Sequence, residues 1–416
     1  MRPIALRSRS LGLSAESATA VALALLLVVL TIAPIVGVVV SAMGAGQGFG
    51  PGLFVKVLGS TRLIGNTLLV GVASTLIAVA IGAALAVILV RLDTPGRGVL
   101  SWLVPLPIYL PPLLTAITWS WLGSPRGGLI NMAAREMLGA TGPLINSQSA
   151  TGVILVTALA YVPIPFLLIS AALRNMDPAL EDIARVHGAT PAGALARVTL
   201  PLMLPAVLGS GLLVFVQAIG MFSVPAVLGM PAGFYVATTE IYKLLDNYPP
   251  RIGEAAVWGL LLLAVSALLI WLQTRLLSAR GYVTVTGKAF RPRTLRIGRL
   301  RPLLAAFAWL HVGLAVILPL VTLCWAASIS FLTIDPKAME PTLKHFTYVL
   351  FSYPKTWLAA ENSLVLGMLC ASIVTVLGLG VGWLVVRSRL ALRHFLDHAS
   401  MLPLSVPAMV FALGIL

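Results

Sequence analysis

The polar residues best placed to act on a partner lie in one segment of an otherwise apolar chain, residues 177–205. Asp177-Pro178 is typical of a helix start, because aspartate accepts hydrogen bonds from the free N–H groups of a first turn and proline fits the first helical position. Gly188 is placed to end this helix, and Thr190-Pro191 repeats the start signal before Leu200-Pro201 leads into an apolar run. The segment therefore predicts a helix–turn–helix, and a short rigid helix suits mechanical docking with a soluble protein.

The chain lacks the residue groupings of common enzyme sites. No G-x-x-x-x-G-K-[ST] phosphate-binding loop occurs, since Gly287-Lys288 is followed by Ala289, and there is neither H-E-x-x-H nor a G-x-S-x-G elbow with partners. The two cysteines, Cys324 and Cys370, lie in apolar runs and cannot form a disulfide framework or a metal cluster. The sequence predicts no catalytic residue, no metal site and no cofactor.

Membrane helices must carry the polar segment, because 59% of the 416 residues are hydrophobic and only 10% are charged, against about 25% in soluble chains. We predict an all-α integral membrane protein with about nine spans. The first is a span rather than a signal peptide, because its apolar stretch is too long. The third and ninth runs contain several prolines, so we expect those helices to be kinked or broken. The apolar runs are 18–43, 63–90, 100–122, 150–173, 200–228, 255–276, 304–330, 362–386 and 396–416.

The positions of the basic residues predict the orientation. If the N-terminus is cytoplasmic and the spans alternate, 19 of the 28 Lys and Arg residues fall on the cytoplasmic side, as the positive-inside rule requires. Most of the excess lies between residues 275 and 301, in a connector that would face anionic lipid headgroups. The net charge of +15 therefore reflects topology, and we expect no nucleic-acid partner.

Acidic residues are absent from the cores of the predicted spans: all 13 Asp and Glu lie in loops or at span ends. Carriers driven by ion gradients usually need ionisable groups inside the membrane, so that class is disfavoured and the energy for transport should enter elsewhere. A membrane-embedded enzyme is disfavoured as well, because no acid–base or metal residues cluster. Gln217, in the middle of the fifth run, either lines a pathway or bonds a neighbouring helix, and the sequence favours neither.

An internal repeat organises the chain. Residues 66–120 align with residues 362–416 without a gap, at an offset of 296 and with 13 identical pairs. The pairs include positions that rarely match by chance, such as Arg91 with Arg387 and Pro111 with Pro407. Six spans separate the copies, so both enter the membrane in the same direction. We predict a tandem parallel repeat with a pathway between the halves.

The repeat predicts the domain boundaries. The first domain is residues 1–276, with six spans and the helix–turn–helix at 177–205; a basic connector follows at 277–303, and a second domain occupies 304–416. The second copy reaches Leu416 inside its third span. We therefore expect the second domain to be incomplete and the natural chain to continue for about 130–160 residues, with a second such loop near 473–501.

The helix–turn–helix resembles the EAA loop of binding-protein-dependent ABC importer permeases, which reads E-A-A, three residues, Gly, nine residues, I-x-L-P. Asp182-Ile183-Ala184 takes the E-A-A place, Gly188 follows after three residues, and Val198-Thr199-Leu200-Pro201 follows after nine more. Asp for Glu, Ile for Ala and Val for Ile are the departures, and Glu181 keeps a second acid nearby. With its spans and its duplication, the chain resembles fused two-domain permeases of the ferric-iron importer type.

This resemblance implies the fold of a type I ABC importer transmembrane domain in the bacterial inner membrane. It implies a permease that is not itself an enzyme and that couples to two copies of a cytoplasmic ABC ATPase. A periplasmic or lipid-anchored solute-binding protein would deliver the cargo: ferric iron, or alternatively a polyamine, a phosphonate or thiamine. The residues that the resemblance assigns to ATPase coupling are Glu181, Asp182, Ala184, Arg185, Gly188, Leu200 and Pro201.

Overall fold

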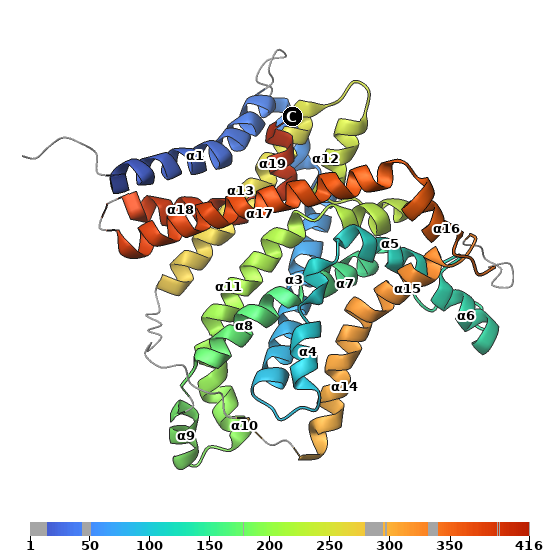
Figure 1. Cartoon of the computed structure of the whole chain (residues 1–416), viewed down its shortest axis with the longest axis horizontal. Coiled ribbons are helices and arrows are strands. Elements are labelled where there is room, and N and C mark those ends of the chain that lie inside the picture. The colour runs from blue at the N-terminus through green and yellow to red at the C-terminus, as the bar shows by residue number, and fades with distance from the viewer. Residues whose placement is uncertain are drawn as a thin grey trace, which may run out of the picture.

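The computed structural model describes residues 15–43, 51–177, 179–278, 294–295, 298–331, 340–388, 390 and 392–415. Within these residues the chain is helical almost throughout and forms no strand (Figure 1). The α-helices are α1 (Ala15–Ala42), α2 (Pro51–Gly59), α3 (Thr61–Val90), α4 (Arg97–Leu103), α5 (Pro112–Gly123), α6 (Leu129–Leu138), α7 (Ala150–Tyr161), α8 (Pro163–Asn175), α9 (Ala179–Val186), α10 (Pro191–Ala194), α11 (Leu200–Ile219), α12 (Ala237–Asp246), α13 (Ile252–Ser278), α14 (Arg301–Val312), α15 (Leu318–Ala327), α16 (Lys344–Thr347), α17 (Lys355–Arg387), α18 (Leu392–Ser405) and α19 (Ala408–Ile415). Short 3-10 turns lie at Leu106–Tyr109, Met230–Ala232 and Gly298–Leu300, and π turns at Leu195–Thr199, Pro225–Gly229, Gly313–Ile317 and Tyr348–Ser352.

The described residues hold seven helical segments long and apolar enough to cross a membrane, or eight if a bent pair forms one span. The bent pair, Arg97–Tyr109 with Pro112–Gly123, turns by 98° and confirms the predicted break in the third run. The ninth run is divided as well, into α18 and α19, because Pro407 cannot donate the backbone hydrogen bond that would join them. Neither part reaches spanning length, so this run does not add the ninth span that the sequence predicted. The segments are Ser17–Ala42, Thr61–Val90, Ala150–Asn175, Leu195–Ile219, Ile252–Leu272, Gly298–Ala327 and Lys355–Arg387.

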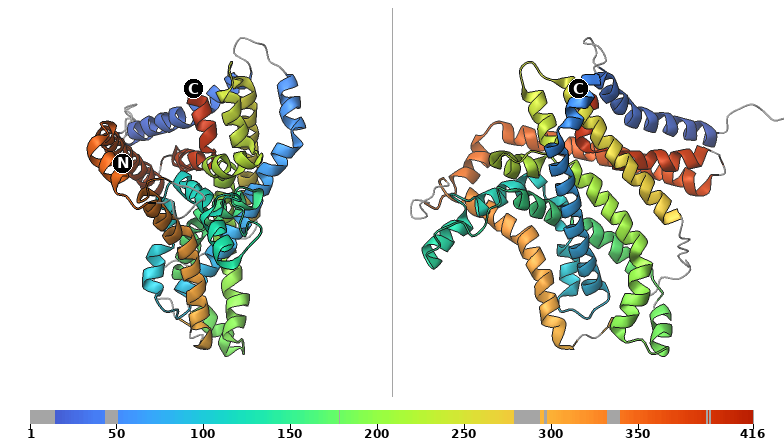
Figure 2. Two further views of the ribbon diagram at one scale, coloured as in Figure 1. Left: turned by 90° about the vertical axis from the view of Figure 1, so that its right-hand side faces the viewer. Right: turned by 180° about the vertical axis from the view of Figure 1, so that it is seen from behind.

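Helix boundaries follow the sequence repeat. The long helix α3, the shorter α4 and the proline break before α5 are matched in order by α17, α18 and the break before α19. In Figures 1 and 2, however, α17 crosses the direction of α3, whereas the repeat predicts that the two run in parallel. Helix α17 packs mainly against α18 and α1 and is exposed along most of its length, so few contacts set its direction. The parallel arrangement of the copies stays a prediction.

The predicted domain limits fall close to helix ends. Helix α13 continues to Ser278 and α14 begins at Arg301, so the ends of the basic connector are helical. Residues 279–293 and 296–297 of that connector lie outside the described residues. The division into two domains therefore stays a prediction.

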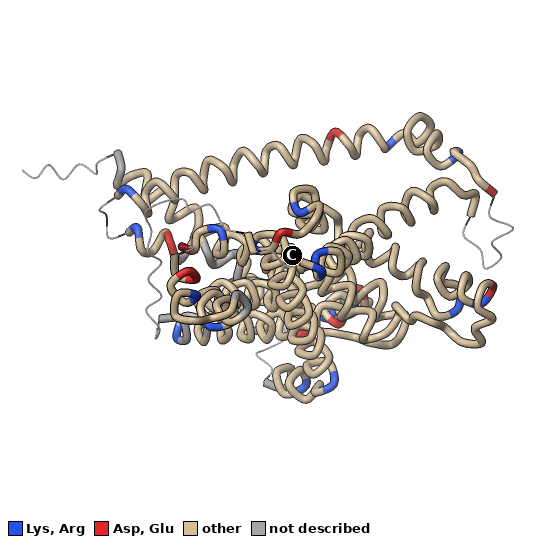
Figure 3. Tube along the Cα trace, turned by 90° about the horizontal axis from the view of Figure 1, so that it is seen from below, with Lys and Arg blue, Asp and Glu red and all other residues tan. Residues whose placement is uncertain are grey.

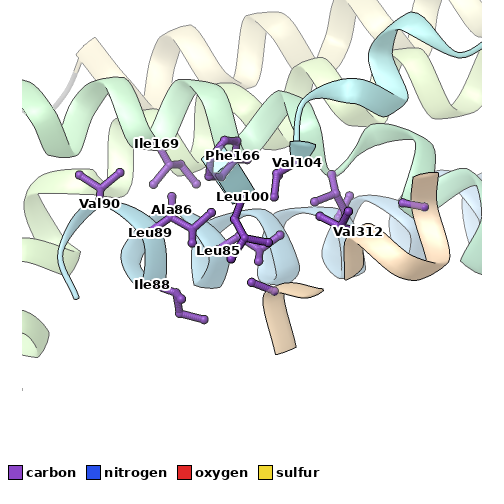
Figure 4. Close-up of a cluster of buried hydrophobic side chains, with 14 of the residues drawn as sticks. Leu85, Ala86, Ile88, Leu89, Val90, Leu100, Val104, Phe166, Ile169 and Val312 are labelled. Atoms are coloured by element: carbon purple, nitrogen blue, oxygen red, sulfur yellow. The ribbon is translucent and has the colours of Figure 1, made fainter. Parts of the chain in front are cut away.

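The central core is built on α3, which packs against α7, α8 and α11. Glycine permits the close crossing with α8, because a Cβ on Gly82 would lie 2.7 Å from Pro165 Cγ and 2.9 Å from the Phe166 nitrogen. Membrane helices use small residues at such crossings, since lipid gives them little hydrophobic drive to associate. Figure 4 shows the packed result: side chains of α3, α4, α8 and α14, including Leu85, Phe166 and Val312, meet in one buried cluster.

Candidate functional site

The helix α9 stands at one end of the molecule, below the long helices in Figure 1. Its start is capped as the sequence predicted, because Asp177 Oδ1 accepts a hydrogen bond from the Ala179 N–H at 2.9 Å. Helix α10 is capped in the same way by Thr190, whose Oγ1 accepts from the Gly193 N–H at 3.1 Å. Both caps satisfy N–H groups that a first helical turn leaves free.

The turn between the two helices depends on Gly188. Its φ of +86° lies in the left-handed region that side chains disfavour. The Gly188 N–H donates to the Arg185 carbonyl at 3.0 Å, and the Ala189 N–H donates to the Ala184 carbonyl at 3.0 Å. These two bonds form a Schellman motif, which closes the last turn of α9 and reverses the chain. The predicted helix–turn–helix is thereby confirmed.

The second helix runs directly into a span. Helix α10, the π turn Leu195–Thr199 and α11 follow one another without a break in helical backbone geometry. Pro201 explains the π turn, because its ring clashes with the carbonyl four residues earlier and it lacks an N–H. The wider turn relieves that clash. Continuous helix therefore links the α9–α10 turn to α11, and a movement of the turn would be transmitted to α11.

The inner face of α9 carries a buried ion pair. The guanidinium of Arg91, the residue after α3, contacts Glu181 Oε1, and the same oxygen accepts a hydrogen bond from Thr199 Oγ1. Arg91 and Thr199 are 0% exposed and Glu181 is 8% exposed. The three residues join the end of α3, helix α9 and the π turn that precedes α11.

The outer face of α9 is partly apolar. Val186 is 85% exposed, and Leu180 and Ile183 are exposed on the same helix. Asp182 and Arg185 lie among them, with 3.9 Å between their charged groups. Exposed apolar residues flanked by charges are typical of a surface that another protein covers.

The predicted site residues divide between these two faces. Arg185 and Gly188 lie at the exposed surface, as do Leu200 and Pro201 at the start of α11, and Asp182 and Ala184 are half-buried. Glu181 lies on the inner face of α9, where its carboxylate contacts Arg91. Gln217 is half-buried in α11, away from α9, and its backbone carbonyl accepts a hydrogen bond from the Tyr161 hydroxyl at 3.1 Å. The two readings of its side chain stay open.

Sequence reasoning missed Arg91 and Thr199 as members of this site. The repeat did mark Arg91, because Arg387 occupies the matching position in the second copy. Charged groups gather at helix ends and turns, and long helical stretches between them are uncharged (Figure 3). Within the described part of the chain, no three His, Cys, Asp or Glu side chains are grouped to hold a metal ion.

Comparison with known proteins identifies sequence relatives of the chain. A family described as binding-protein-dependent transport system inner membrane component matches residues 77–280, which include the helix–turn–helix. The chain is 24% identical over 405 residues to the ferric transport system permease protein FbpB of Actinobacillus pleuropneumoniae, covering 91% of this chain and 55% of that protein. It is 33% identical over 209 residues to a probable molybdenum ABC transporter permease protein of Haloferax volcanii, covering 49% of this chain and 72% of that protein.

A solved structure shares the fold. It is a bacterial ABC transporter involved in the import of the acidic polysaccharide alginate, with a TM-score of 0.51 and 20% identity over 62% of this chain and 92% of that one. A second structure, of a bacterial alginate ABC transporter in complex with an alginate pentasaccharide-bound periplasmic protein, matches with a TM-score of 0.50 and 22% identity over 61% of this chain and 90% of that one. At such identities the likeness concerns the fold alone.

This chain spans only 55% of the ferric permease FbpB. From its matched sequence and its apolar helices, the chain belongs to the family of binding-protein-dependent transport system inner membrane components, the multi-pass permease subunits of ABC importers.

Proposed function

We propose that this chain forms part of the solute pathway of an ATP-driven importer and that α9 docks on a separate cytoplasmic ATPase. The observation that carries the proposal is the capped helix α9, which presents exposed Ile183 and Val186 at the end of the spans. A rigid helix with an apolar outer face gains stability when a soluble partner covers it. The continuous helix from Pro191 to Ile219 then connects that contact to a membrane span.

The docking surface proposed here consists of Asp182, Ala184, Arg185, Ile183 and Val186. Gly188 shapes the turn behind this surface, and Leu200 and Pro201 shape the return to the membrane. Glu181 acts from the inner face. The distribution of basic residues supports an orientation with α9 and the N-terminus in the cytoplasm. Two ATPase copies and an external solute-binding protein complete the importer in this proposal.

Ferric iron is the proposed cargo. The support is the relative named as a ferric permease, whose alignment covers 91% of this chain. The relative named for molybdenum is more similar over a shorter stretch and makes molybdate the alternative. In this arrangement the external binding protein selects the cargo, so the permease needs no metal-ligand set. Uptake of radiolabelled ferric iron and of molybdate by the reconstituted importer would separate the two.

Site-specific cross-linking tests the docking role. With Cys324 and Cys370 replaced by serine, Val186→Cys places a thiol-reactive photo-cross-linker on the outer face of α9. Lys243→Cys is the matched control, because that side chain is exposed on α12, at the opposite end of the molecule in Figure 1. We expect cross-links to the cognate ATPase from Val186→Cys only. A complex that hydrolyses ATP yet gives no cross-link from Val186→Cys would contradict the proposal.

A further inference from the structure

A buried charge lies where the docking helix meets the core of the first domain. Arg91 is fully buried directly after α3, beside Leu89 and Val90 of the central cluster. Among the described residues, Glu181 is the only carboxylate paired with it. The Nε and Nη1 atoms of Arg91 have no hydrogen-bond partner in that part of the chain. The guanidinium therefore depends on Glu181 for its compensation.

This dependence restricts how α9 can move. If α9 slid or rolled away from α3, a buried guanidinium would lose its only described counter-charge, which is costly in an apolar surrounding. Salt screens a buried pair much less than an exposed one, so the contact persists at physiological ionic strength. An apolar contact of similar size between α9 and α3 would let the helices slide slightly past one another, because apolar contacts are not directional.

The same segment also contacts Leu295 and the first residue of α14. The Leu295 N–H donates to the Arg91 carbonyl at 2.8 Å, and the Asp93 N–H donates to the Leu295 carbonyl at 3.1 Å. Arg301, the first residue of α14, donates through Nε to the Asp93 carbonyl at 3.0 Å, and this Nε lies 3.4 Å from Asp93 Oδ2. The segment after α3 thus contacts α9 through Arg91, and through Arg91 and Asp93 it contacts Leu295 and the first residue of α14.

We propose that Arg91 is a positioning residue that fixes α9 to α3 through Glu181, so that movement imposed on α9 is carried into α3 and, through Asp93, into α14. The inference rests on the proposed docking of α9 to an ATPase. Thr199 contributes by holding the same Glu181 oxygen from the start of the α11 span. The docking surface itself, on the outer face of α9, is separate from this pair. Coupling can therefore be lost while ATPase binding is kept.

The test uses the full chain reconstituted with its ATPase and binding protein, and it measures ATPase association, ATP hydrolysis and solute uptake. Glu181→Gln leaves Arg91 buried without a counter-charge. ATPase association should persist. The number of ATP molecules hydrolysed per solute imported should rise at least about tenfold, because loss of one buried partner shifts the equilibrium between attached and detached α9 by more than that factor. The exchange Arg91→Glu with Glu181→Arg should recover part of the coupling. Thr199→Val should raise the same ratio more mildly, and Thr199→Ser should not.

Glu254→Gln is the matched control. Glu254 is also a buried carboxylate with basic partners, Lys56 at 3.1 Å and Arg251, but these lie on α2 and beside α13, away from α9. Its loss should leave the ratio of ATP to solute unchanged, even if stability falls. Wild-type association with normal coupling in Glu181→Gln, or equal uncoupling in Glu254→Gln, would overturn this inference alone. Failure of the wild-type chain to bind the ATPase would instead overturn the proposed function and this inference with it.

Discussion

Replacing Gly188 with valine should reduce transport without preventing membrane insertion. Its φ of +86° is left-handed, and a residue with a side chain pays about 1–2 kcal/mol there. A Cβ at this position would meet no atom within 4 Å, so the whole effect comes from backbone strain. Since 1.4 kcal/mol corresponds to a factor of ten, the docking-competent turn should become about 5- to 30-fold less populated. Valine should lie at the upper end because it is β-branched, whereas asparagine, which tolerates this conformation, should cost little.

The natural control for this substitution is Gly139, at the end of α6. Its φ is +63°, its surroundings are equally open, and it also ends a helix, where the Gly139 and Ala140 N–H groups donate to the Arg135 and Ala134 carbonyls. Gly139→Val therefore imposes the same kind of strain at a helix end that the proposed coupling does not use. ATP-driven uptake in proteoliposomes and co-purification with the ATPase are the assays. Normal uptake and association in Gly188→Val, or equal losses in both variants, would refute the reasoning.

Three further outcomes follow from the structure. Thiol reagents that do not cross membranes should label Arg185→Cys only from the cytoplasmic side and Lys243→Cys only from outside; labelling of both from one side would contradict the orientation. Gly82→Leu should destabilise the α3–α8 crossing by roughly 1–3 kcal/mol through overpacking, measured as a lower thermal transition in detergent. Gly65→Leu should change this transition little, because a Cβ there meets nothing within 4 Å, and equal shifts would refute the packing argument. Ferric iron, but not molybdate, should be imported when the cognate binding protein is present; the reverse would favour molybdate as cargo.

The features that the sequence predicted well are set by neighbouring residues. Asp177 and Thr190 cap their helices and Gly188 reverses the chain because each acts on backbone groups within a few positions. Proline likewise breaks the third apolar run from within. The all-helical membrane fold follows from apolar run lengths for the same reason, since each span satisfies its backbone hydrogen bonds within its own segment.

The inner half of the site could not be predicted in this way. Arg91 and Glu181 are distant in the sequence, and nothing local indicates that their side chains meet. Both residues were visible as charges near span ends, where a solvated position is the ordinary expectation for a lone charge. Only the packing of α3 against α8 and α11, which depends on small residues such as Gly82, brings the end of α3 close to the start of α11 and so encloses the pair.

The buried pair also bears on how energy can enter this chain. The predicted spans contain no acidic residue in their cores, so the apolar helices themselves offer nothing for an ion gradient to act on. In the proposed mechanism, a mechanical input at α9 reaches the spans through contacts that keep the helices fixed against one another. Covalent continuity provides one such route, from α10 through the π turn to α11, but this route reaches only one helix. Arg91 provides the second, because its side chain holds α9 while the residues beside it hold α14. Replacing the pair by apolar residues of similar volume would keep the helices packed, since buried ion pairs add little net stability, but it would remove this fixed register. Stability and coupling should therefore separate in such a variant.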